Sequence, residues 1–479
     1  MQFVGLASAK SRAPHVTFRT RVLANTACLL LLVSAPRAQE ASAPAPPPDA
    51  TVAQRVDDYM QAEVRVNGFS GSILLARKGT PIVARGYGFA NAEWNIANTP
   101  RTKFRLGSIT KQFTSMVVMQ LQQQGRLKVQ DPICQYLTPC PDTWKAITVH
   151  HLLTHTSGIP SYTNSPSYMA TMMVPKTVEQ MVAGFRDLPL EFEPGAQFKY
   201  NNSGYFLLGV LIETITGQPY ERVLTDQIFR PLGLKDSGYD TPNRILPMRA
   251  AGYSRQGSDI VNAPFLDMVQ PFSAGALYST VEDLLTWDQA LYTDRLLQAD
   301  ARNAMFTPFK GGYAYGWQVP TPSPQTFGRK QVAHGGGING FSTMIIRLPD
   351  ENVTSIVLSN VQQAPTSRIA RDLLAILLGQ PYRVAVVRTV ATVDPKLYDE
   401  YVGQYQLTPT FILTVTRDGD RLMTQATGQP KFEIFPESDT KFFLKVVDAQ
   451  LTFVRDERGA VTHVILHQGG KDQRAARMP

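Results

Sequence analysis

A serine and a lysine three positions apart are the residues whose types and spacing first indicate chemistry. Ser108 and Lys111 lie in the stretch FRLGSITKQF, at the start of a segment with helical apolar spacing. Residues at positions i and i+3 share one face of a helix, so the amine can approach the hydroxyl. A serine hydroxyl becomes a good nucleophile when a neighbour takes its proton, and a lysine removed from water can do so because its pKa falls. The alternative is structural, since a serine before a helix is more often an N-cap.

Two later stretches contain groups that would complete such a site. Tyr200 and Asn202 stand in KYNNSG just before a strongly apolar helical segment, and HGGG begins at His334 just before a strand. A phenol can relay protons, and an amide can position a substrate. Glycines let a strand backbone approach another group closely because they have no Cβ. The three stretches together predict nucleophilic catalysis.

In this order the three stretches resemble the motifs of a known superfamily. Ser108-Ile-Thr-Lys111, Tyr200-Asn-Asn202 and His334-Gly-Gly336 are similar to the S-x-x-K, S-D-N and K-T-G set of serine β-lactamases and DD-peptidases, especially the class C β-lactamase and DD-carboxypeptidase branch. The phrases HHLLTHTSGIP (150–160) and PLGLKDSGY (231–239) also resemble that branch. The resemblance covers about residues 52–381.

The resemblance implies a role for each motif residue. Catalysis would fall to Ser108, Lys111 and Tyr200, and substrate binding to Asn202, His334, Gly336 and Gly337. Ser108 would be acylated while the lysine and the phenol manage its proton. The backbone N–H groups of Ser108 and Gly337 would form the oxyanion hole. His334 stands where many relatives have lysine, and because histidine titrates near neutral pH we expect weaker or pH-dependent recognition of a substrate carboxylate.

Strand patterns at both ends of this region predict the elements that position the site. A helix is expected within VAQRVDDYMQAEV, a hairpin turned at Lys78-Gly79, two apolar strands joined at 349–352 and a helix in SRIARDLLAILLG. The segment 131–291 is mostly helical and loop-rich, and YAYGWQV (313–319) is an aromatic strand expected to pack in the core. We therefore predict an α+β, β-lactamase/transpeptidase-like fold: one antiparallel sheet built from both ends, flanked by helices, plus a helical subdomain.

The residue pattern changes after the hydrolase region. Residues 395–479 read as short strands with alternating apolar residues. This pattern predicts a small all-β barrel, which resembles the lipocalin-like domain appended to some of these hydrolases.

The N-terminal end of the chain has a different composition. Residues 39–51 form a Pro/Ala-rich linker. Residues 1–38 read as a secretory signal peptide whose apolar run is too short for a permanent membrane span. The protein is therefore expected to be periplasmic or secreted, with residues 52–381 as the hydrolase domain.

The charge balance argues against a nucleic-acid partner. Lysines and arginines number 47 and acidic residues 39, and removal of residues 1–38 would remove five basic residues and no acidic ones. The net charge then falls from +8 to 42 − 39 = +3, and the sequence contains no block of consecutive lysines and arginines.

Of three cysteines, Cys28 lies in the signal segment. Cys134 and Cys140 remain, either as a small-loop disulfide in an oxidising compartment or as two free thiols.

Several other functions are less well supported by the sequence. His151 and His155 have no HExxH pattern and no third ligand, so a structural role is preferred and neither a metal nor a cofactor is expected. No serine lies in the G-x-S-x-G motif of the α/β-hydrolase nucleophile elbow.

The leading hypothesis is an exported serine hydrolase that acts on β-lactams or D-amino-acid peptides, that is, on a small-molecule or peptide substrate. An esterase or D-aminopeptidase of the same superfamily and an inactive cell-wall-fragment sensor remain alternatives, and the oligomeric state stays open.

Overall fold

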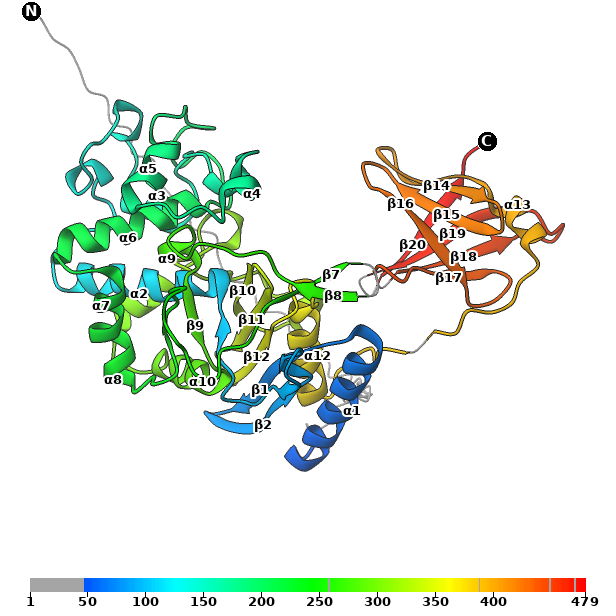
Figure 1. Ribbon diagram of the computed structural model, residues 1–479, viewed down its shortest axis with the longest axis horizontal. Coiled ribbons are helices and arrows are strands. Elements are labelled where there is room, and N and C mark those ends of the chain that lie inside the picture. The colour runs from blue at the N-terminus through cyan, green and yellow to red at the C-terminus, as the bar shows by residue number, and fades with distance from the viewer. Residues whose placement is uncertain (1–46, 257–258, 387, 448, 469–470) are drawn as a thin grey trace, which may run out of the picture. The chain divides into compact units, whose positions relative to one another are not determined.

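A computed structural model describes residues 47–256, 259–386, 388–447, 449–468 and 471–479 (Figure 1). The expected signal peptide, Cys28 and most of the expected linker lie outside these residues. Within them, no helix is both long enough and apolar enough to cross a membrane.

A five-stranded antiparallel sheet forms the centre of the first domain. Its strands run in the order β10-β11-β12-β1-β2, with β1 at Gly71–Arg77, β2 at Thr80–Tyr87, β10 at Val332–Ile338, β11 at Phe341–Leu348 and β12 at Val353–Ser359. The β1–β2 turn uses Lys78 and Gly79, both with positive φ, as a two-residue hairpin requires. The sheet therefore joins two segments about 250 residues apart, which confirms the predicted architecture.

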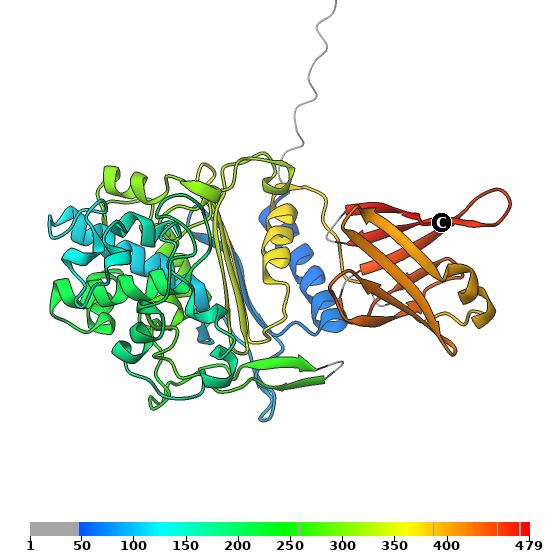
Figure 2. The same cartoon turned by 90° about the horizontal axis from the view of Figure 1, so that it is seen from above.

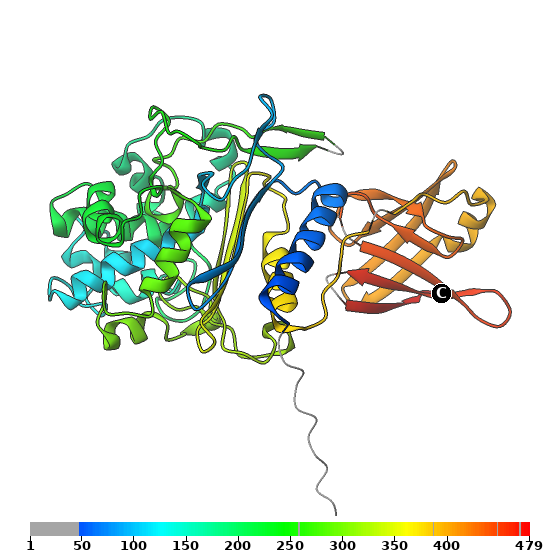
Figure 3. The same cartoon turned by 90° about the horizontal axis from the view of Figure 1, so that it is seen from below.

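Two helices cover one face of this sheet. Helix α1 (Asp49–Asn67) and helix α12 (Thr366–Leu378) lie side by side on it, as Figures 2 and 3 show. Their apolar residues share one buried cluster with the sheet. The buried Glu63 carboxylate of α1 pairs with Arg368 of α12 at 2.7 Å. Because α1 begins at Asp49, the last three residues of the expected linker are helical.

Helices and loops cover the other face (Figure 2). They are α2 (Thr110–Gln123), α3 (Val149–Leu153), α4 (Tyr168–Thr171), α5 (Val178–Arg186), α6 (Asn202–Thr216), α7 (Tyr220–Leu224), α8 (Arg230–Leu232), α9 (Phe272–Gly275), α10 (Val281–Ala290) and α11 (Ala299–Met305). Helix α2 runs through the middle of this layer, and twelve of its fourteen residues are buried. The predicted helical subdomain is confirmed, and its core is continuous with one face of the sheet.

Several short strands in this region were not predicted. They are β3 (Phe89–Asn91) with β4 (Ile96–Ala97), β5 (Phe104–Arg105) with β9 (Leu277–Ser279) and β6 (Gly238–Tyr239), and β7 (Tyr253–Gln256) with β8 (Asp259–Asn262). Strands of two to four residues are too short to show alternation of apolar and polar residues.

The prediction of an aromatic strand at 313–319 is wrong. This segment forms only isolated bridges, between Tyr313 and Gln318 and between Gln318 and Ala333.

A closed antiparallel barrel of eight strands follows. Its strands are β13 (Gly403–Thr408), β14 (Phe411–Asp418), β15 (Arg421–Ala426), β16 (Lys431–Pro436), β17 (Lys441–Phe443), β18 (Ala449–Arg455), β19 (Val461–Gln468) and β20 (Lys471–Arg477), after a short helix α13 (Tyr398–Tyr401). Alternate residues fill a core of its own, and pairing of β13 with β20 closes the barrel. The predicted all-β barrel is confirmed.

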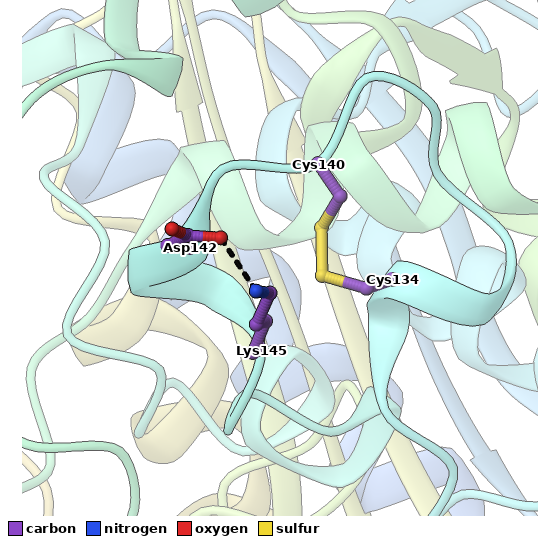
Figure 4. Close-up of a disulfide and its surroundings, with 4 residues drawn as sticks. All are labelled: Cys134, Cys140, Asp142 and Lys145. Atoms are coloured by element: carbon purple, nitrogen blue, oxygen red, sulfur yellow. Dashed lines mark ion pairs between the residues drawn. A yellow bond between two sulfur atoms is a disulfide. The ribbon is translucent and has the colours of Figure 1, made fainter.

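The two cysteines that follow α2 form a disulfide. Cys134 and Cys140 have Cα atoms 5.5 Å apart, within the range a bridge requires (Figure 4). This resolves the choice between a disulfide and two free thiols. The nearby Asp142–Lys145 ion pair lies on the surface, where such a pair contributes little to stability.

Candidate active site

Ser108 lies in a short 3₁₀ turn, Gly107–Ile109, that leads directly into α2. The residues that cap this turn and α2 are Leu106 and Ile109, and neither makes a side-chain capping bond. The Ser108 hydroxyl is therefore not an N-cap. It lies 3.1 Å from Lys111 Nζ, so the predicted serine–lysine contact exists on the helix face that the spacing indicated.

Lys111 is fully buried, and its amine has three oxygen neighbours. Besides Ser108 Oγ, Nζ lies 2.8 Å from Asn202 Oδ1 and 2.9 Å from the carbonyl oxygen of Ala274. It forms no ion pair with a carboxylate among the described residues. Burial lowers the pKa of Lys111 well below its usual value, because the charged form loses hydration without gaining a counter-ion.

The N-terminus of α6 brings Asn202 to the lysine. The preceding Asn201 caps this helix by accepting from Gly204 N at 2.7 Å, which fixes the first turn. Asn202 then donates through Nδ2 to Thr163 Oγ1 at 3.0 Å, while its backbone N–H donates to Ser161 Oγ at 3.1 Å. These bonds orient the Asn202 side chain so that its carbonyl oxygen faces the lysine.

Tyr200 places its ring beneath the lysine amine. Lys111 Nζ lies 4.9 Å from the centre of this ring. The Tyr200 hydroxyl is buried and makes no standard hydrogen bond to a described residue. Burial raises the pKa of the Tyr200 phenol, and the nearby Ser108 opposes part of that rise. The phenol is thus protonated at neutral pH and lies close to the Ser108 hydroxyl.

His334 on β10 is buried and engaged at both ring nitrogens. Its Nδ1 lies 2.6 Å from the carbonyl oxygen of Gly335, and its Nε2 lies 2.8 Å from the hydroxyl of Tyr313. Burial, with a contribution from the Lys111 charge, lowers the pKa of His334 to about 3. The expectation that His334 titrates near neutral pH is therefore wrong, because the chain removes this imidazole from water beside a second basic group.

Glycines allow the edge strand β10 to lie directly against the serine turn. A Cβ on Gly336 would lie 1.9 Å from the carbonyl oxygen of Leu106, and a Cβ on Gly107 would lie 3.0 Å from the backbone nitrogen of Gly337. Gly107 also has φ +55°, a conformation that favours glycine. Gly337 is exposed, so its backbone is accessible beside Ser108. The structure thus brings all seven predicted residues into one region.

Two histidines for which the sequence favoured a structural role lie around this region. The buried His155 ring packs against Tyr200 and Tyr313 at centroid distances of 4.3 and 4.4 Å, and its Nδ1 accepts from Asn201 N at 3.1 Å. These contacts agree with the structural role expected for His155 in the phrase at 150–160, but its place against Tyr200 has no signal in the sequence. His151 accepts from Thr148 N as part of the cap of α3, and no group of three or more metal-binding side chains occurs among the described residues.

Chemically, the arrangement places an amine that favours its uncharged form within bonding reach of one hydroxyl. The buried phenol of Tyr200 lies beside the same hydroxyl, and the accessible backbone of Gly337 lies next to the serine turn. Such a set can activate a nucleophile and stabilise an oxyanion without a metal ligand set.

The chain is similar in sequence and fold to several known proteins. The Beta-lactamase family profile matches residues 52–380, and a domain of unknown function (DUF3471) matches residues 387–477. Penicillin-binding protein 4* of Bacillus subtilis is 30% identical over 443 residues, covering 85% of this chain and 95% of that protein. The octameric penicillin-binding protein homologue of Pyrococcus abyssi is 26% identical with a TM-score of 0.63, covering 88% of this chain and 99% of its own. A D-stereospecific amidohydrolase of Streptomyces sp. is 27% identical with a TM-score of 0.57, covering 70% and 100%.

Proposed function

The chain belongs to the β-lactamase family of serine hydrolases, and from this premise we propose that it forms an acyl-enzyme on Ser108 with β-lactams or D-amino-acid peptides. Export to the periplasm or the medium is part of the proposal, because cell-wall peptides are found there and the N-terminal segment reads as a signal peptide. Its penicillin-binding and D-stereospecific relatives support this substrate class.

The hydrogen bonds of Lys111 are the observation that carries the proposal. Asn202 Oδ1 and the Ala274 carbonyl oxygen can only accept hydrogen bonds. An uncharged amine has two hydrogens, and these two acceptors use both. Its lone pair then faces Ser108 Oγ, 3.1 Å away, and can take the hydroxyl proton. These three contacts allow a general base, and burial without a counter-ion, which lowers the pKa of Lys111, favours the uncharged amine over an ammonium.

The chemical steps follow from this arrangement. Ser108 Oγ attacks the substrate carbonyl carbon while its proton moves to Lys111 Nζ. The carbonyl oxygen becomes an oxyanion that the backbone N–H groups of Ser108 and Gly337 stabilise. Tyr200 relays the proton to the leaving nitrogen or oxygen, so the bond to the leaving group breaks as that group becomes neutral. Water then attacks the ester and regenerates the Ser108 hydroxyl.

Covalent labelling tests the proposal. Wild-type protein is incubated with a fluorescent penicillin, and the adduct is measured by gel fluorescence and intact mass. We expect one adduct per chain, lost in Ser108→Ala and retained in Ser165→Ala, whose serine is exposed and bonds to the Ser167 hydroxyl rather than to an amine. No adduct in the wild type with penicillin or any other acyl donor would refute the proposal. Acylation that is never released would instead favour the sensor hypothesis.

A second candidate is an esterase or D-aminopeptidase with little β-lactam chemistry. The favouring observation is His334, which stays uncharged where many relatives have a lysine to meet a substrate carboxylate. Hydrolysis rates of nitrocefin, a D-Ala-D-Ala peptide and a short-chain nitrophenyl ester separate the two candidates. Turnover of nitrocefin alone would contradict the second one.

A further inference from the structure

His155 bonds to the backbone on both sides of Tyr200. Its carbonyl oxygen accepts from the backbone N–H of Lys199 at 3.0 Å, and its ring Nδ1 accepts from the backbone N–H of Asn201 at 3.1 Å. Residues 197–201 belong to no helix or strand, so they lack the regular bonds that hold most of a protein backbone in place. His155 therefore fixes the short segment that carries the Tyr200 phenol.

The imidazole of His155 also packs against the Tyr200 ring. The two ring centroids lie 4.3 Å apart, and the imidazole contacts the rings of Tyr205 at 5.0 Å and Tyr313 at 4.4 Å as well. His155 is 1% exposed, so it is enclosed by these rings and the protein around them. A change at His155 would therefore displace the Tyr200 ring, whose hydroxyl lies close to Ser108.

The backbone of His155 has an uncommon conformation. Its φ is +57°, in the left-handed region that few residues other than glycine adopt. Such strain persists where surrounding contacts hold it, and it concentrates at functional sites. A glycine would relieve the strain but would have no ring to accept from Asn201 or to pack on Tyr200. The strained backbone thus indicates that the side chain has a function at this position.

His155 is unsuited to proton transfer in the reaction. An uncharged imidazole has one ring nitrogen that accepts, and the Asn201 N–H occupies it. Nε2 then carries the hydrogen, is buried and has no hydrogen-bond partner among the described residues. Burial lowers the pKa of His155 well below its usual value, and the nearby Lys111 and His334 lower it further. The ring therefore stays uncharged and acts through its contacts.

We propose that His155 is a positioning residue that holds the Tyr200 phenol at the leaving group, through its bond to the Asn201 N–H and its contact with the Tyr200 ring. The inference rests on the proposed acylation of Ser108, in which Tyr200 passes a proton to the leaving nitrogen or oxygen. Loss of His155 should therefore matter most for acyl donors whose leaving group needs that proton.

Two esters of one N-acyl-D-alanine test this inference, because they share the acyl group and differ in the leaving group. Nitrophenolate leaves without a proton at neutral pH, whereas methoxide must be protonated as it leaves. In His155→Phe, which keeps a ring but loses the acceptor, the methyl-to-nitrophenyl ratio of kcat/KM should fall about tenfold. A missing general acid costs about 10²- to 10⁴-fold, and here the phenol remains but is displaced. A residue that only stabilises the fold would leave this ratio unchanged.

Tyr200→Phe is the reference and His150→Phe the control. Tyr200→Phe should lower the ratio about 10²-fold. Adding His155→Phe to it should lower the ratio no further, since His155 acts through a hydroxyl that is already absent. His150→Phe also removes a histidine bond, between Nδ1 and the Tyr315 hydroxyl at 2.8 Å, but that hydroxyl is not on a predicted site residue. Its ratio should stay at the wild-type value.

His155→Asn is the conservative variant. Asparagine tolerates the left-handed backbone, and its Oδ1 can replace Nδ1 as the acceptor for the Asn201 N–H. We expect it to keep most of the ratio that His155→Phe loses, although the missing ring should lower its melting temperature.

Three outcomes would overturn the inference while leaving Ser108 acylation intact. These are a ratio that stays at the wild-type value in His155→Phe or in Tyr200→Phe, a ratio that falls as far in His155→Asn as in His155→Phe, and a further fall when His155→Phe is added to Tyr200→Phe. Failure of both esters and of every other acyl donor to acylate Ser108 would instead refute the proposed function, and the inference with it.

Nitrogen NMR of the wild-type protein tests the inference without a variant. His155 is the one histidine that a threonine follows, so selective labelling of that pair assigns its signals. The ring should be uncharged with its hydrogen on Nε2 from pH 6 to pH 8. A hydrogen on Nδ1 in this range would exclude the bond from Asn201 and overturn the inference.

Discussion

At the residue scale, the site depends on a lysine that is buried without a counter-ion. In the proposed mechanism the uncharged amine is the active form, so acylation should fail as the pH drops through the pKa of Lys111. Burial lowers that pKa well below its usual value, and the acid limb of the kcat/KM profile must therefore lie well below pH 10.5. The same burial costs stability at neutral pH, because the unfolded chain binds the proton more readily than the folded chain.

Asn202→Asp tests this electrostatic account. The substitution keeps the shape but places a carboxylate at 2.8 Å from Nζ, which raises the pKa of Lys111 and holds it protonated. We expect kcat/KM at pH 7 to fall about 10²- to 10³-fold, the range for loss of a general base, and to recover as the pH rises. Asn202→Ala, which removes the same bond without adding charge, should show no such alkaline shift in a stopped-flow pH profile.

The sequence predicted contacts better than it predicted charge states. Ser108 and Lys111 could be predicted to meet because residues three positions apart share one face of a helical turn. The charge state of His334 depends first on burial that no local pattern shows, and then on Lys111, which reaches it from another part of the chain. Its titration was therefore predicted wrongly even though its place in the site was predicted.

At the element scale, the close approach of β10 to the serine turn sets the geometry. Gly336 is the contact position, since a side chain there would overlap the carbonyl oxygen of Leu106. Thr343 of β11 reinforces the contact by donating to the same oxygen at 2.7 Å. The strand and the turn must stay together for Gly337 to face Ser108.

Gly336→Ala should therefore harm activity through position. The added carbon forces β10 away from the turn, and we expect kcat/KM to fall about 10²-fold, as displacements of about 1 Å do. The free energy of unfolding should fall by about 1–3 kcal/mol from overpacking. Gly335→Ala on the same strand adds a carbon with ordinary contacts at 3.4 Å, so its urea unfolding curve should match the wild type. Equal unfolding curves for both variants would contradict this account.

The disulfide between Cys134 and Cys140 belongs to the same scale. It closes a loop of about seven residues, which should stabilise the fold by about 2 kcal/mol through the unfolded chain. The double variant Cys134→Ser, Cys140→Ser should lose that amount in urea unfolding and still acylate Ser108. Reductant should lower the stability of the wild type and leave the double variant unchanged, and equal sensitivity of both would contradict a stabilising bridge.

Element length decided which parts of the fold could be predicted. The strands at 71–87 and 341–359 have seven or eight residues each, so their apolar runs and turn residues are visible in the sequence. Strands β6 and β9 have two and three residues and form by pairing across distant segments. Their existence is a consequence of tertiary packing and has no local signature.

At the scale of the whole molecule, the buried apolar residues fall into separate clusters. Two clusters lie on the two faces of the five-stranded sheet and hold the first domain together. A third fills the barrel and shares no residue with the other two. A part of the chain with its own closed core can fold independently.

Truncation between these parts is the corresponding test. A chain ending at residue 386 keeps both clusters of the first domain and every residue proposed for catalysis. We expect its rate of Ser108 acylation to stay within about twofold of the full chain, as for independent parts, and residues 388–479 alone to melt cooperatively by circular dichroism. Each strand of the closed barrel pairs with two neighbouring strands, which favours a soluble isolated fragment. A truncated chain that keeps its fold but loses acylation would show instead that the barrel contributes to the active site. The two domains would then have separate cores, and acylation of Ser108 would still require both.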